Sequence, residues 1–226
     1  MDKLKRLPQF IISISLAISA VLAQQAASWV EKQKTAPGWL PAIVALLIIG
    51  GGSYALRLFL ELFLDSSKRL RKFILGRQFI EGTWLDISKA EGQPIIIAVS
   101  RIEFAGSSVR FAGEDFSMDT RRRGHYLTDI AWLDWPRLKY KYTYQVSDAC
   151  QISNQGYGEK LFIERDGLPR EYVGFYFDLL EGKRVTYEGW RVEDPALLRQ
   201  LDDPKTRRQA AIDFFKWRIE ELGGSR

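Results

Sequence analysis

Cysteine and histidine are almost missing from this chain of 226 residues, which contains one of each, Cys150 and His125. A single cysteine excludes an internal disulfide, and a domain that folds without disulfides is typical of a reducing compartment. A domain outside the cytoplasm that uses no disulfides is the alternative. One histidine and one cysteine also exclude a zinc site built from several such ligands. We therefore expect no metal and no cofactor.

Charged residues are missing from two long stretches near the start of the chain. The first runs from about residue 10 to 30 and is interrupted only by Ser and Gln. The second runs from about 39 to 64, and its first 18 residues carry no charge. Because a helix rises about 1.5 Å per residue, each stretch is long enough to cross a bilayer. We predict two transmembrane helices joined by a short loop.

Acidic residues are scarce in residues 1–72, which contain ten Lys/Arg and four Asp/Glu, a formal charge of +6. Residues 73–226 contain 33 − 10 = 23 basic and 28 − 4 = 24 acidic residues, a charge of −1. The basic pI therefore belongs to the membrane segment. This argues against a DNA or RNA polymer as partner, because a polyanion-binding domain needs a basic face.

Basic residues flank the two expected spans. Lys3, Lys5 and Arg6 precede the first, and a juxtamembrane cluster at 68–72 follows the second. The positive-inside rule then predicts a multi-pass protein of the cell inner membrane with both termini cytoplasmic. Residues 1–23 also read as a secretory signal, but the apolar run continues beyond the possible cleavage site to Trp29, which favours an uncleaved span.

Small residues recur every four positions in the first expected span and form a run in the second. Such residues let helix backbones approach closely. Either the two spans of one chain pack together, or spans of different protomers associate in a homo-oligomer. The residues concerned are Ser15, Ser19, Ala23, Ala27, Gly50, Gly51 and Gly52.

Helical periodicity is missing between residues 81 and 192, where short segments rich in aromatic and β-branched residues alternate with Gly, Pro and Asp. This spacing predicts a meander of about eight strands that closes into a small barrel, and closure removes exposed edges. The interior of such a barrel is either filled by side chains or holds one small ligand. The expected strands are Gly82–Ser88, Pro94–Phe104, Ser107–Ala112, Asp115–Asp119, Thr128–Leu133, Leu138–Val146, Gly158–Arg165, Glu171–Leu179 and Lys183–Val192.

The last part of the chain, residues 194–226, reads as a helical tail. Asp194 with Pro195, and again Asp203 with Pro204, are helix-start signals. The second helix is expected to run to about Leu222. Its apolar stripe either covers the barrel or forms an oligomer contact. The fold class is thus membrane-anchored all-β: spans in 1–72, a cytoplasmic barrel in 73–193 and a helical tail.

No set of residues predicts catalysis, and we expect a protein that is not an enzyme. Two weak patterns point instead to ligand binding. Arginines bind phosphate through paired hydrogen bonds; the alternative is that these arginines form a solvated basic loop. Tyrosines stack on bases; the alternative is that these tyrosines are ordinary aromatic residues of the barrel core. The candidate ligand-binding residues are Arg110, Arg121, Arg122, Arg123, Arg191, Tyr140, Tyr142, Tyr144, Tyr172 and Tyr176.

The order of these parts resembles a known family. Two spans, a basic juxtamembrane stretch, and Gly82-Thr83-Trp84 at the first strand of a small meander barrel are similar to the two-transmembrane β-barrel effectors of bacterial CBASS anti-phage defence. The Gly82-x-Trp84 start also resembles the first strand of lipocalins, in which the Trp plugs the barrel floor. The likeness covers residues 1–192 in layout, and the helical tail has no counterpart in it.

The resemblance implies a function. In that family the barrel is a sensor that binds a cyclic di- or trinucleotide made by a partner nucleotidyltransferase. Binding promotes oligomerisation through the spans, which contact membrane lipid, and disruption of the inner membrane causes abortive infection. The alternative is a membrane-tethered, lipocalin-like binding or scaffold protein without toxic activity.

Overall fold

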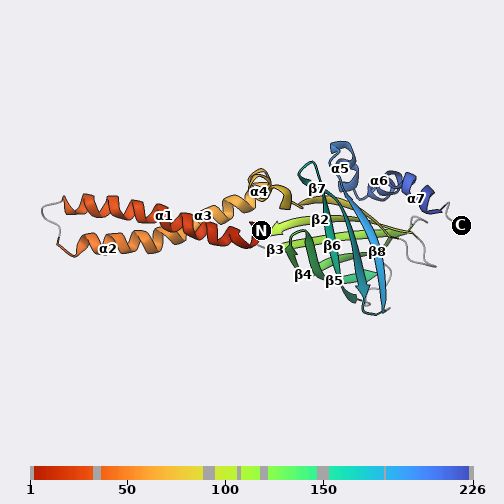
Figure 1. Ribbon diagram of the computed structural model, residues 1–226, viewed down its shortest axis with the longest axis horizontal. Helices are drawn as coiled ribbons and strands as arrows, with labels where there is room; N and C mark the ends of the chain where they lie inside the picture. The colour runs from red at the N-terminus through yellow and green to blue at the C-terminus, as the bar shows by residue number, and fades with distance from the viewer. Residues whose placement is uncertain are drawn as a thin grey trace. The chain divides into compact units, whose positions relative to one another are not determined.

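The computed structural model describes residues 3–32, 37–88, 95–105, 108–117, 122–146, 153–180 and 182–223. The chain divides into two compact units, Asp2–Leu75 and Gly76–Arg226 (Figure 1). The division falls three residues beyond the expected boundary at residue 72. The helical tail belongs to the same unit as the barrel.

The first unit is a helical hairpin. Its two apolar stretches, Gln9–Glu31 and Leu40–Leu64, have 23 and 25 residues and are long and apolar enough to cross a membrane. They coincide with the expected spans at 10–30 and 39–64. The elements are α1 (Lys3–Glu31), α2 (Leu40–Leu47), the π-helical turn η1 (Ile48–Gly52), α3 (Ser53–Ser66) and α4 (Lys68–Leu75).

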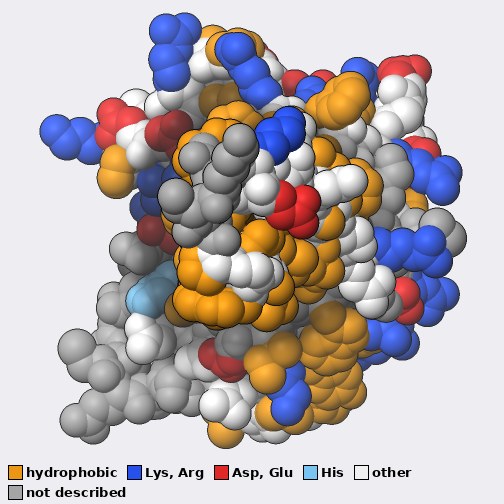
Figure 2. All heavy atoms as spheres, turned by 90° about the vertical axis from the view of Figure 1, so that its left-hand side faces the viewer, with side chains coloured by type: hydrophobic (Ala, Val, Ile, Leu, Met, Phe, Trp, Pro, Cys, Tyr) orange, Lys and Arg blue, Asp and Glu red, His pale blue; other side chains and the backbone are white. Residues whose placement is uncertain are grey.

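The outward surface of the hairpin is apolar. Leu46 and Leu47 are each 69% exposed, far more than an aliphatic side chain in a water-soluble core. Figure 2, which looks onto the hairpin, shows hydrophobic side chains gathered over it. Such a surface is stable in lipid and costly in water.

The small-residue stripe of α1 lies inside the hairpin. Ser15, Ser19 and Ala23 are 1%, 1% and 2% exposed, and Ala27 is half-buried. Their small side chains let α1 approach the second span closely. The sequence left open whether this stripe packs the two spans of one chain together or joins protomers. In the structure it packs the two spans of one chain.

The glycines of the second span divide between the two surfaces of the hairpin. A methyl group placed on Gly52 would lie 3.6 Å from the Ser19 hydroxyl, so Gly52 faces α1. A methyl group on Gly50 or Gly51 would meet nothing within 4 Å. These two glycines remain on the outer surface, where association between protomers stays a prediction.

The second unit contains the closed barrel predicted from the sequence. Its eight antiparallel strands pair in chain order, and β8 returns to pair with β1. The strands are β1 (Gly82–Ser88), β2 (Ile96–Ala105), β3 (Ser108–Ser117), β4 (Arg122–Asp134), β5 (Arg137–Val146), β6 (Ser153–Arg165), β7 (Leu168–Asp178) and β8 (Lys183–Arg191).

Several bounds of the expected strands were wrong. β4 begins at Arg122 rather than Thr128, and β6 begins at Ser153 rather than Gly158. The segments 107–112 and 115–119 form one strand, β3, because Gly113 between them stays in the ladder opposite Tyr126. The turn after β6 contains only Asp166 and Gly167, whose φ angles are 54° and 74°. Two residues with positive φ fit a tight hairpin turn, so β7 already begins at Leu168.

Tyrosine and glycine are paired across the strands inside the barrel. Five inward tyrosines each lie directly opposite a glycine, and the ring occupies the space that a side chain on the glycine would need. This close approach keeps the rings near the wall and leaves room at the centre. The pairs are Gly113–Tyr126, Tyr140–Gly158, Tyr142–Gly156, Tyr172–Gly189 and Gly174–Tyr187.

The tail forms three short helices, α5 (Pro195–Asp202), α6 (Arg207–Phe214) and α7 (Lys216–Gly223). The first start signal is confirmed, since the Asp194 carboxylate accepts a 2.9 Å hydrogen bond from the Ala196 N–H. At the second, the Asp203 carboxylate likewise accepts from the Lys205 N–H, but only a turn follows, and α6 begins at Arg207 rather than at Pro204. The expected long helix is also interrupted at Phe215, whose ring is fully buried.

The tail covers the barrel, which was one of the two alternatives that the sequence left open for its apolar stripe. Its apolar side chains pack on the outer face of β1, β2 and the end of β3, and they form a core separate from the barrel interior. The buried members of this core are Leu85, Ile87, Ile97, Val99, Phe116, Val192, Leu201, Ala210, Ala211 and Phe215.

Candidate ligand cavity

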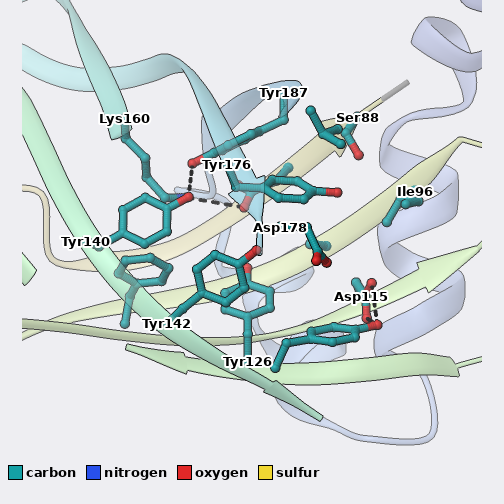
Figure 3. A pocket seen from close by; sticks show the side chains of 15 residues that line it. Ser88, Ile96, Asp115, Tyr126, Tyr140, Tyr142, Lys160, Tyr176, Asp178 and Tyr187 are labelled. Carbon is teal, nitrogen blue, oxygen red and sulfur yellow. Dashed lines mark hydrogen bonds and ion pairs between the residues drawn. The ribbon is translucent and has the colours of Figure 1, made fainter. Parts of the chain in front are cut away.

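A cavity of about 140 Å³ lies inside the barrel. It reaches the end of the barrel where β1, β3, β5 and β7 end. Gly82, the first residue of β1, lies at the opposite end of the barrel. Figure 3 shows tyrosine and aspartate side chains from different strands directed into it. The lining residues are Asp86, Ser88, Ile96, Ala98, Phe111, Asp115, Tyr126, Tyr140, Tyr142, Tyr144, Lys160, Tyr176, Asp178, Val185 and Tyr187.

The other end of the barrel is closed by aromatic rings. Trp84 is fully buried, and its indole N–H donates a 2.9 Å hydrogen bond to the Ile80 carbonyl. Its ring contacts Phe162 and Tyr172, with centroids 5.3 and 5.1 Å away. The cavity is therefore blind-ended, with Trp84 below its floor as the lipocalin-like start of β1 predicts.

A buried charge network forms the cavity floor. Lys160 and Asp86 have side chains 1% and 8% exposed, with the Nζ 3.4 Å from a carboxylate oxygen. Tyr172 accepts a hydrogen bond from Lys160 and donates one to Asp86. Burial lowers the pKa of Lys160, and the charge of Asp86 counteracts part of that effect. The ammonium also lies 4.1 Å from the centroid of the Tyr172 ring.

Neutral tyrosine hydroxyls form the cavity walls. The Tyr140 and Tyr187 hydroxyls are 2.8 Å apart and share a hydrogen bond. Burial raises the pKa of Tyr126, Tyr140 and Tyr187 well above the ordinary value. These groups therefore remain protonated at physiological pH, and each can both donate and accept a hydrogen bond.

Two carboxylates lie at the mouth of the cavity. Asp115 lies two residues before the end of β3 and Asp178 ends β7, on opposite sides of the ring of eight strands. The Tyr144 hydroxyl lies 3.2 Å from both oxygens of Asp115. Asp178 accepts from the Asn154 amide at 2.5 Å and from the Leu180 N–H at 2.9 Å. Among the described residues, no group of three or more potential ligands is arranged to hold a metal ion.

The structure brings together four of the five tyrosines predicted to bind a ligand. Tyr140, Tyr142 and Tyr144 share the inner face of β5, and Tyr176 faces them from β7. Tyr172 instead lies in the floor network. Their common location is confirmed, whereas ligand binding by any of them stays a prediction.

Two of the predicted arginines, Arg110 and Arg191, do not line the cavity. Arg110 is on the exposed outer face of β3, because its neighbours Val109 and Phe111 point inward. Arg191, expected to reach a barrel mouth, lies at the closed end instead. Its guanidinium donates to the carbonyls of Phe79 and Glu81 at 2.8 and 2.6 Å.

The Arg121–Arg123 segment is only partly described. Arg121 lies outside the described residues, and for Arg122 and Arg123 the structure describes the backbone alone. That backbone begins β4 beside the cavity mouth, where Arg122 pairs with Phe116. The backbone of Arg122 and Arg123 therefore lies at the end of the barrel where the cavity reaches the surface.

Sequence reasoning missed the charged lining of the cavity and two of its tyrosines. Asp86 follows Trp84 at a spacing of two, so alternation alone places it inward. Tyr187 stands between Val185 and Gly189 on the same face of β8. The glycines opposite the tyrosines were a further signal, but recognising them requires the strand register.

Comparison with known proteins does not extend this description. No protein-family model and no curated protein matches the chain. One solved structure with some similarity is a de novo designed fluorescence-activating β-barrel, 15% identical, with a TM-score of 0.35. The match covers 52% of this chain and 97% of the designed barrel. At this level of similarity it carries no argument about function.

Proposed function

We propose that this chain is a membrane-anchored receptor whose barrel binds one small ligand. The observation that carries the proposal is the blind-ended cavity lined by tyrosine hydroxyls and carboxylates. A barrel that serves only as a scaffold fills its interior with close-packed side chains. A concave space with convergent polar groups is the usual form of a ligand site. The two apolar helices supply the anchor.

The proposed ligand is a cyclic di- or trinucleotide, and the proposed output is assembly of the spans of several protomers. This is the role that the resemblance to CBASS effectors implies, with both termini cytoplasmic and the inner membrane as target. The tyrosine rings support it, because they stack on bases. A ligand drives assembly only if the assembled form binds it more tightly.

The second candidate is a membrane-tethered binding protein without toxic activity. The charge of the cavity favours it: the described lining contains three aspartates and Lys160, and no arginine. A cavity of this charge disfavours a phosphate-rich ligand in its interior. This candidate has the same anchor and the same cavity, and it differs in ligand and output.

Ligand class is tested by thermal unfolding of the full chain in detergent micelles with cyclic di- and trinucleotides. A ligand at 100 times its Kd stabilises the folded state by about 2.7 kcal/mol. Ala98 lines the cavity, whereas Ala112 is exposed on the outer face of β3. Ala98→Phe should abolish the stabilisation by filling the cavity, and Ala112→Phe should retain it. If no cyclic nucleotide raises the unfolding temperature of the parent chain, the nucleotide proposal is wrong.

Output is tested with the full chain reconstituted into dye-filled vesicles of bacterial lipid. The effector proposal expects dye release only when the stabilising ligand is added, and no release from vesicles that carry Ala98→Phe. Ligand binding without release would support the second candidate. Constitutive release without ligand would contradict both.

A further inference from the structure

The charge inside the barrel changes with depth, and this limits how a ligand can enter. Asp86 and Lys160 at the floor are bonded to each other and to Tyr172. The carboxylates of Asp115 and Asp178 lie at the mouth. With −3 from the aspartates and +1 from the lysine, the described lining has a formal charge of −2. A phosphate that moved into this space would leave water for a negative potential.

The groups at the mouth are suited to a donor-rich partner. An ionised carboxylate only accepts hydrogen bonds, so what Asp115 can take from a ligand is an N–H or O–H group. Hydrogen bonds to ionised groups are about twice as strong as neutral ones. Below Asp115, the rings of Tyr126, Tyr142 and Tyr176 face the same space (Figure 3). Tyrosine rings stack on flat π-systems, and their faces favour electron-poor, N–H-bearing rings.

The size of the cavity sets the same limit independently of charge. Its volume of about 140 Å³ is below the range of about 300–1,000 Å³ typical of sites that enclose a drug-sized ligand. A whole cyclic dinucleotide is larger than such ligands. Only one part of it, a single flat ring, has room between the tyrosines.

We infer that a cyclic nucleotide enters the barrel base first, with an amino-bearing base between the tyrosine rings, its N–H edge at Asp115, and its phosphates outside the cavity. This rests on the proposed function, and it adds which bases are accepted and which part of the ligand is buried. Adenine, guanine and cytosine carry an exocyclic amino group. Uracil and hypoxanthine lack one. Each offers only a ring N–H beside a carbonyl oxygen, and a carboxylate repels that oxygen.

The test is a binding series with the full chain in detergent micelles, measured by calorimetry. The four ligands are the cyclic dinucleotides of adenosine, guanosine, uridine and inosine. The adenosine or guanosine ligand should bind at least about tenfold more tightly than the inosine ligand, which lacks the exocyclic amino group. A lost hydrogen bond to a carboxylate weakens binding by about that factor or more. Equal affinity across the series would overturn the inference.

The variant Asp115→Asn separates contact from repulsion by the sign of its effect. Each ligand carries two negative charges, so removing a carboxylate that touches no donor should tighten binding by relieving repulsion. Removing one that accepts the base N–H should weaken binding of the amino-bearing ligands about tenfold or more and leave the uridine ligand no weaker. Glu103→Gln removes an exposed carboxylate on β2, outside the cavity, and is the matched control.

The outcomes distinguish the two levels of the proposal. If the parent chain binds none of the four ligands, and no cyclic di- or trinucleotide raises its unfolding temperature, the nucleotide function itself fails. If it binds them and Asp115→Asn binds as tightly or more tightly, the base-first orientation fails and the function stands. The base series uses the parent chain alone, so it decides the question even if Asp115→Asn does not fold.

Discussion

The buried pair of Lys160 and Asp86 is the residue-scale feature with the clearest energetic consequence. Removing one member of a buried ion pair leaves the other charge without compensation, which costs about 3–5 kcal/mol. Replacing both members with apolar groups is often nearly neutral. We expect Lys160→Met to lose that amount of unfolding free energy, and Lys160→Met with Asp86→Leu to regain most of it.

This is measured by denaturant unfolding of the full chain in micelles as a double-mutant cycle. The outer pair Arg137–Glu159, 3.4 Å apart with Arg137 57% exposed, is the control. Its removal should change stability by at most about 1 kcal/mol, since exposed pairs are weak. A loss below 1 kcal/mol for Lys160→Met would show that water reaches the floor.

The buried tyrosines make the barrel sensitive to alkali. Burial raises the pKa of Tyr140, Tyr172 and Tyr187 in the folded state, so above the unfolded value of about 10 the folded chain binds more protons than the unfolded chain. Their contribution is complete below pH 10 and is lost as pH rises, by up to about 1.4 kcal/mol per pH unit for each group.

We therefore expect a steep loss of stability above about pH 10. Absorbance of tyrosinate should show these three groups ionising only together with unfolding. Reversible ionisation of every tyrosine in the folded protein near pH 10 would contradict the buried location of these rings.

At the scale of elements, Phe215 shows how the tail is attached. Its ring is fully buried and lies 5.5 Å from the Trp190 ring, edge to face. Phe215→Ala should cost about 3–5 kcal/mol of unfolding free energy, because a large buried ring leaves a cavity. Trp217 on the next helix is 54% exposed, and Trp217→Ala should cost much less. Equal losses measured by thermal unfolding would contradict the core between tail and barrel.

The elements were predictable where a local pattern determines them. The spans follow from apolar length, and the inward tyrosines of β5 follow from alternation. The merging of two segments into β3 was not predictable, because Gly113 reads as a breaker until Tyr126 is known to lie opposite. The place of Arg191 at the closed end likewise depends on how the ring closes, which no local pattern contains.

At the scale of the whole molecule, the two units require different solvents. Leu46, Leu47 and their neighbours on the hairpin are exposed, whereas the tail covers the apolar outer face of β1 and β2. We expect the chain to stay with membranes during extraction at high pH and to dissolve only in detergent. Recovery of the intact chain in the aqueous fraction would contradict a membrane anchor.

Because the barrel is closed at Trp84, the cavity has a single opening. Whatever enters must leave by the same route, and its departure retraces its arrival. Substitutions of rim residues that do not contact the bound ligand should therefore change the rates of arrival and departure by the same factor and leave Kd unaltered. Substitutions deep inside should change mainly the residence time. Measuring the association and dissociation rates of a set of variants would thus show which residues line the route of the ligand, without a structure of the complex.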